Sequence, residues 1–211
     1  MDAAVVFRSA VTDLEAGLNQ QRRVRPLLAF EKQPPPRRLA PFAAAIGATV
    51  HDPDLSEETV SGGGEDADTE IGWGSFVLLY DPAGQTGWAG PFRVIAYIRA
   101  DLEPEIAADP LVGQVGWSWL TEALDTRTTG YHQVSGTVTR VVTEGFGAKQ
   151  AEPVATGFEL RASWSPSGPG APRDLDGHVA AWCDTLCTAA GLPPLPAGVS
   201  PLRPRPRRRP R

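Results

Sequence analysis

Residues 76–99 read FVLLYDPAGQTGWAGPFRVIAYIR, two apolar runs separated by a segment rich in Gly and Pro. In the second run, every other residue is apolar and falls on one face of an extended strand: Phe92, Val94, Ala96 and Ile98. The turn residues 81–84 follow directly after the first run, and such clusters end strands. The stretch therefore predicts an antiparallel β-hairpin that forms the first half of a sheet.

A second hairpin is predicted from residues 133–143 and 154–164. Its second strand alternates cleanly, with Phe158, Leu160, Ala162 and Trp164 on one face. In the first strand, Arg140 interrupts the alternation before Val142. Either a β-bulge intervenes or Arg140 faces inward with a partner, and we favour the bulge.

Helical periodicity occurs in three longer stretches, residues 2–18, 116–124 and 174–190. Asp174 is the predicted N-cap of the last helix, and Gly191 and Pro193 end it. Between the first helix and the first hairpin we expect a basic connector over residues 19–38 and a short amphipathic helix from Leu39 to Gly47. The expected fold is α+β, with about four antiparallel strands as two hairpins (ββ-α-ββ-α) and helices packed on one face.

The length of 211 residues favours a single domain, which we place at residues 1–202. Gly and Pro together number 43, so irregular segments take a share of the chain. Residues 52–70 hold eight acids and no base, which predicts a mobile acidic loop. Residues 203–211 hold six of the 20 basic residues and no acid, so we expect a disordered Arg/Pro tail on a body with a net charge of −11.

The sequence also indicates in which cellular compartment the protein resides. It has no run of 18 apolar residues, its first residues lack the pattern of a signal peptide, and its two cysteines make no disulfide framework. We expect a cytoplasmic protein without a membrane partner. An exposed strand at the sheet edge would also favour pairing of two copies, so a dimer is a further expectation.

Four strings carry a resemblance to a known family: FVLLYDP at 76–82, GWSWLTEAL at 116–124, SGTVTR at 135–140 and AWCDTLCTAAGLPPLP at 181–196. With them the chain resembles the uncharacterised actinobacterial family called domain of unknown function 3000, over roughly residues 1–202. The resemblance implies no activity, substrate or catalytic residue.

Sequence constellations for catalysis and metal binding are weak. Cys183, Cys187 and His178 are the obvious metal candidates, but His178 and Cys187 fall on opposite sides of a helix, so packing is the better interpretation of the cysteines. Gly62–Gly64 lacks the Lys-Ser/Thr ending of a phosphate loop. We therefore expect no cofactor and no metal. Whether the protein is an enzyme stays open, and the interpretation as a non-enzyme is favoured.

Six tryptophans are more than four short strands need for a core, so part of them is expected on a binding surface. The candidate residues are Trp117, Trp119, Trp88 and His132. The leading hypothesis is a non-catalytic interaction or regulatory protein that binds another protein or a second copy of itself. The alternatives are a small-molecule enzyme or ligand-binding domain with a Trp-lined pocket, and weak nucleic-acid association through the arginines of the tail: Arg203, Arg205, Arg207, Arg208, Arg209 and Arg211.

Overall fold

The computed structural model describes residues 2–25, 27–52, 70–167 and 174–192. These residues form one antiparallel sheet of six strands in the order β1-β2-β3-β4-β6-β5. The strands are β1 Leu28–Gln33, β2 Phe42–His51, β3 Glu70–Tyr80, β4 Phe92–Asp101, β5 Tyr131–Thr143 and β6 Ala155–Pro166. The α+β class is confirmed, although four strands in two hairpins understate the sheet.

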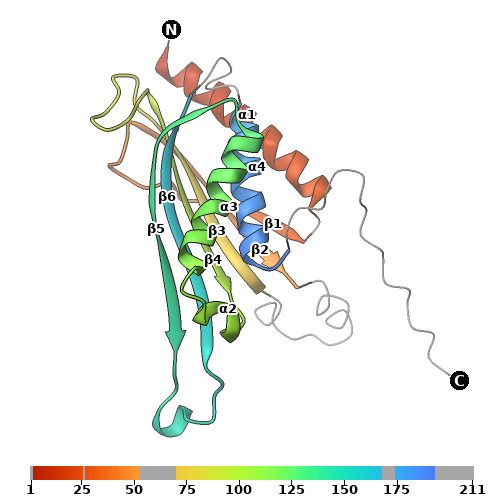
Figure 1. Cartoon of the computed structure of the whole chain (residues 1–211). Helices are drawn as coiled ribbons and strands as arrows, with labels where there is room; N and C mark the ends of the chain where they lie inside the picture. Colours follow the sequence, from red (N-terminus) through yellow and green to blue (C-terminus); the bar gives the residue numbers. More distant parts are fainter. Residues whose placement is uncertain (1, 26, 53–69, 168–173, 193–211) are drawn as a thin grey trace, which may run out of the picture.

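The helices lie on one side of this sheet (Figure 1). They are α1 Ala3–Val24, α2 Pro104–Ala108, α3 Val112–Arg127 and α4 Leu175–Ala189. In the view of Figure 1, α4 lies between α1 and α3 and in front of the strands. We call the covered side of the sheet its inner face and the other side its open face. Among the described residues, no helix is long and apolar enough to span a membrane.

The alternation of side chains along the strands builds the core on the inner face. Phe76 of β3 pairs with Ala96 of β4, and Ala96 pairs with Ala162 of β6, so the three side chains share a face. The predicted apolar stripe of α4 packs on them, and its Trp182 is fully buried. Gly74 of β3 makes room for this indole, because a Cβ there would lie 3.0 Å from Trp182 Cζ2.

The two strands that precede the first hairpin correct the sequence analysis. The expected basic connector contains β1, and the expected short helix from Leu39 to Gly47 is instead the start of β2. Its run of alanines favours a helix when the segment is considered alone. Pairing with β1 on one side and β3 on the other determines the strand, since it satisfies the backbone of both edges of β2.

A bulge does occur in β5, but not at the predicted place. The register with β6 is continuous from Ser135 to Thr143, so Arg140 faces the same side as its partner Phe158. Arg140 Nη1 donates to the carbonyl oxygen of Asp109 at 3.3 Å, which is the alternative that we had not favoured. The irregularity lies between His132 and Ser135, where Gln133 has a φ of 52°.

A buried ion cluster joins the three long helices. The carboxylate of Asp184 on α4 accepts from Arg25, just beyond α1, and its other oxygen accepts from Arg127 Nε of α3 at 2.7 Å. The helices also approach closely: a Cβ on Gly17 of α1 would lie 2.7 Å from the Cα of Asp176. This contact and the ion cluster together set how the helices pack on one another.

The hairpin of β5 and β6 extends beyond the rest of the sheet and ends in a turn of 3-10 helix at Gly147–Lys149 (Figure 1). At this end Phe146 is 79 % exposed. Other expectations lie outside the described residues: nearly all of the acidic loop at 52–70, and the Arg/Pro tail at 203–211.

Candidate functional site

The open face of the sheet carries the side chains that alternate with the core residues. One row crosses four strands, with Val77 paired to Ile95, Ile95 to Ser163, and Ser163 to Ser135. No helix among the described residues lies over this row (Figure 1). The open face is therefore the side of the sheet on which a ligand can reach the strands.

A groove of about 570 Å³ lies at one end of the open face. Its floor includes Leu79, Ile95 and Ser163, and its wall includes Leu39 and residues 85–88. Two arginines, Arg93 and Arg161, line the groove, and among the residues that the structure describes no Asp or Glu lines it. The groove is thus a cationic site on a chain whose formal net charge is −5.

Arg93 is the most unusual residue of the groove. It projects from β4 onto the open face, yet it is only 8 % exposed. Its Nη2 donates to Ser163 Oγ at 2.7 Å and its Nη1 donates to Ser165 Oγ at 3.3 Å. In the described part of the chain, no carboxylate forms an ion pair with Arg93. Burial lowers the pKa of Arg93, although a guanidinium keeps its charge at physiological pH.

The hydrogen bonds around Arg93 define what the cluster can bind. A serine oxygen that accepts from Arg93 still has its own O–H to donate. Ser163, which lines the groove, therefore adds a hydroxyl donor beside the positive charge, whereas Ser165 is fully buried and holds the guanidinium in place. Donors around an unneutralised guanidinium match a carboxylate or phosphate, which accepts several hydrogen bonds at once. The cluster has the composition of an oxyanion site.

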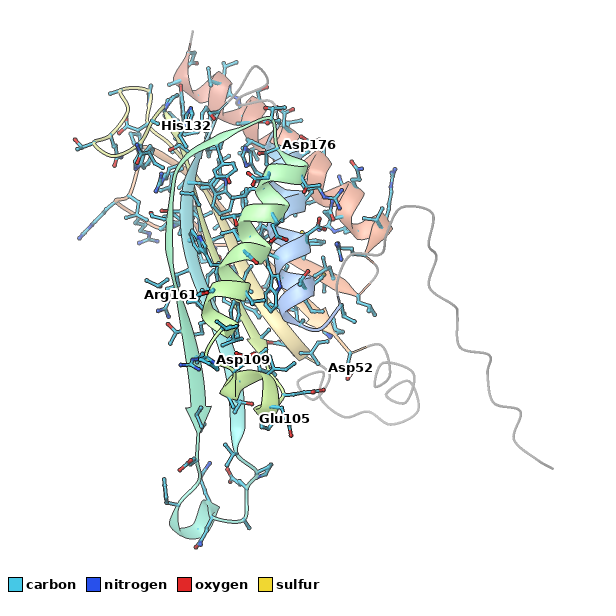
Figure 2. All side chains as sticks on the ribbon, viewed as in Figure 1. Asp52, Glu105, Asp109, His132, Arg161 and Asp176 are labelled. Carbon is cyan, nitrogen blue, oxygen red and sulfur yellow. The ribbon has the colours of Figure 1, made fainter. Side chains whose placement is uncertain are left out.

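Arg161 at the other end of the groove differs from Arg93. Its Nη2 donates to Glu159 at 2.9 Å, and its guanidinium lies over the ring of Tyr97 at 5.4 Å. Its side chain is exposed on the open face of the sheet (Figure 2). The charge of Arg161 is therefore balanced by a neighbouring carboxylate, whereas that of Arg93 is not.

The wall of the groove is held together by one glutamine. Gln85 Nε2 donates to the carbonyl oxygen of Leu39 at 2.9 Å and to Asp81 Oδ2 at 3.1 Å, which links residues 34–41 to the β3–β4 connection. The backbone N–H of Trp88 donates to the carbonyl oxygen of Gln85, and Gly87 between them has a φ of 83°. This tight turn, which needs a glycine, places Trp88 at the groove.

The four predicted surface residues are divided between the two sides of the sheet. Trp88 lines the groove, and His132 is exposed on the open face, where it pairs in register with Ser165. Trp117 and Trp119 belong to α3 on the inner side, and Trp119 packs on Phe158 with ring centroids 5.7 Å apart. The structure does not bring the four residues together into one surface.

Sequence reasoning missed Arg93. In the string FRVIAYIR the residue reads as an ordinary solvent-facing position of an alternating strand. Its serine partners come from β6, which is more than 60 residues away in the chain. The available signal was the pair Ser163 and Ser165 flanking Trp164, which gains meaning only once β6 is paired with β4.

The residues considered for a metal are buried. Cys183 and Cys187 lie in the core, as their packing interpretation predicts, and burial raises the pKa of both thiols. His178 Nδ1 accepts from Trp164 Nε1 at 3.0 Å, and burial lowers the pKa of His178 to about 4. Within the described ranges, no three His, Cys, Asp or Glu residues are grouped in a way that could hold a metal ion.

Comparison with other proteins places the chain in a family and adds no activity. Neither the curated proteins nor the solved structures contain a match. A family model described as "Protein of unknown function (DUF3000)" matches residues 3–200, which include every described strand and helix and all residues of the groove. The chain therefore belongs to the DUF3000 family.

Proposed function

We propose that this protein is a binding protein whose open-face groove holds a ligand with an oxyanion, a carboxylate or a phosphate. The single observation that supports this most strongly is Arg93, a buried guanidinium with two serine partners and no carboxylate partner in the described chain. Buried charges in proteins are generally paired, because removal from water costs several kcal/mol per ion. An anionic ligand would supply the missing charge.

The surroundings of Arg93 support the same proposal. The described residues that line the groove include no acid that would repel an anion. Its volume of about 570 Å³ falls within the range of roughly 300–1,000 Å³ that is typical of small-molecule sites. Ile95 adds apolar surface to the floor, and the exposed Leu39 adds apolar surface to the wall. A ligand of this site would bind its charged end at Arg93 and rest the remainder on the apolar floor.

Thermal unfolding of the full chain with and without anions tests the proposal. A ligand that binds only the folded state raises the melting temperature with its concentration. We expect phosphate or acetate to raise it above the value in chloride of equal ionic strength, and Arg93→Met to abolish this difference. Arg99→Met is the matched control, because Arg99 lies on the same strand and face but is exposed and outside the groove. Equal stabilisation of Arg93→Met and the unchanged chain would contradict the proposal.

A second candidate function, pairing with another protein, is supported by the end of the β5–β6 hairpin. Phe146, Val142 and Val154 are exposed there, and β5 is an edge strand of the sheet. Exposed apolar side chains beside an unpaired strand edge favour association, here most simply with a second copy. Sedimentation equilibrium tests this: we expect a dimer that Phe146→Ser weakens. A monomer at tens of micromolar would contradict it.

A further inference from the structure

The indole of Trp88 stands apart from most other tryptophans of the chain. Trp73, Trp119, Trp164 and Trp182 each contact another aromatic ring. Trp117 packs closely on β5, where a Cβ on Gly136 would lie 2.7 Å from Trp117 Cζ3. Trp88 makes no ring contact with an aromatic residue in the part of the chain that the structure describes. It is only half-buried, in a turn that ends at the groove.

Trp88 is also bordered by space on two sides. It lines the groove, and it lines a second open hollow of about 550 Å³ formed by residues 82–91. A tryptophan in such a position leaves part of its apolar surface uncovered, which costs free energy roughly in proportion to the uncovered area. The surface that faces the groove is available to a ligand.

The groove is larger than an oxyanion alone requires. A carboxylate or phosphate bound at Arg93 would leave Trp88, Ile95 and Leu39 uncovered. In the described part of the chain the lining holds no Asp or Glu that could pair with a cationic ligand body, and the apolar floor disfavours a strongly hydrated one. A flat apolar body matches these residues, because indole rings stack on other planar rings in offset or edge-to-face arrangements.

We infer that the ligand is an aromatic oxyanion, whose charged group binds Arg93 and Ser163 and whose planar ring packs against Trp88. This inference rests on the proposed function and narrows it to a chemical class. Two sources share this chemistry, an aromatic carboxylate and a nucleotide, and they differ in the oxyanion and in the size of the ring.

Two matched pairs of probes test the inference on the full chain. Benzoate and cyclohexanecarboxylate have the same charge and ring size, but only benzoate is aromatic. Adenosine 5′-monophosphate and ribose 5-phosphate differ by the base. Calorimetry or chemical-shift titration gives the affinities, and we expect the aromatic member of one pair to bind about tenfold more tightly, as base–aromatic stacking does. The pair that shows the preference identifies the carboxylate or the phosphate as the source.

Variants of the two anchoring residues separate this inference from the function on which it rests. In Trp88→Leu, the two members of a pair should bind with about equal, weak affinity, because the anion still binds but the ring contact is lost. Trp88→Phe should keep the preference for the aromatic member, because an aromatic ring remains. Arg93→Met should abolish binding of both members of the pair. Melting curves of each variant check that the chain is folded.

The two possible failures are distinguishable. If the aromatic and saturated probes bind equally well, or if Trp88→Leu retains the preference, the inference is wrong and the oxyanion site stands. If none of the four probes binds at millimolar concentration, or if Arg93→Met binds them as the unchanged chain does, both the inference and the proposed function are wrong.

Discussion

The two sides of the sheet differ in whether a buried charged side chain has a counterion among the described residues. On the helix-covered side, Asp184 lies between Arg25 and Arg127, so this buried charge finds its partners inside the chain. On the open face, Arg93 is as buried as Asp184 but has only two serine hydroxyls beside it. A charge that is balanced internally contributes to the fold, whereas one that is left unbalanced beside a groove is available to a ligand.

If this comparison holds, removal of the inner-face charge has the largest effect on stability. Asp184→Asn leaves two arginines without a counterion, and we expect a loss of about 3 kcal/mol. This loss lies at the low end of the range for breaking a buried ion pair, because the Arg127 side chain is 44 % exposed. The free energy of unfolding in urea measures the loss. A change below about 1 kcal/mol would show that the cluster is not needed for helix packing.

The second prediction concerns pH. Burial lowers the pKa of His178 to about 4, against an ordinary value of 6.5, despite the opposing effect of the carboxylates of Asp174 and Asp176. Between these pH values the unfolded chain binds a proton that the folded chain does not bind. Stability is therefore greatest above pH 6.5 and is lost as the pH falls toward 4, by about 3 kcal/mol.

Unfolding in urea at several pH values tests this, with His178→Gln and His132→Gln compared with the unchanged chain. The exposed His132 should leave the pH dependence as it is, whereas His178→Gln should reduce it. If the unfolding free energy depended on pH equally in all three proteins, groups other than His178 would be responsible for the loss of stability in acid.

The third prediction uses the close contact of α3 with the sheet. A Cβ on Gly116 would lie 2.3 Å from Phe158 Cε2, so Gly116→Ala must displace the helix or the ring, at a cost of about 2 kcal/mol. Gly113 on the same helix has nothing within 4 Å of its Cβ position. Gly113→Ala should therefore stabilise the protein by up to about 1 kcal/mol. Thermal melts of both variants measure the contrast, and a loss in both would remove the packing argument.

The smallest effect on stability is expected on the open face. Arg93→Met removes no partner from a buried carboxylate among the described residues. Of the two serine hydroxyls that lose a donor, Ser163 lines the groove and can bond to water, and only the uncharged hydroxyl of Ser165 is fully buried. We expect a change within about 1 kcal/mol without ligand. The same urea measurement serves here. A loss as large as that of Asp184→Asn would mean that Arg93 is part of the fold and would weaken the case for a ligand site.

Local patterns predicted the elements whose residues carry a clear periodicity. The hairpin of β3 and β4, the pairing of β5 with β6 and the helix from Leu175 all follow from apolar spacing. β2 did not, because its run of alanines favours a helix when considered alone, and only pairing with β1 and β3 makes the segment a strand. Arg140 also misled, since its inward position depends on the carbonyl group of Asp109, 31 residues away.

The sequence by itself determined the α+β class, the main apolar faces and the excess of tryptophan, because these depend on neighbours within a few turns or strands. Only the tertiary structure decided that Trp88 and Arg93 line one groove while Trp117 and Trp119 lie on the other side of the sheet. The physical reason is that a binding site depends on which distant strands pair. The hydroxyls beside Arg93 come from β6, and it is the register of β4 with β6 that places them there.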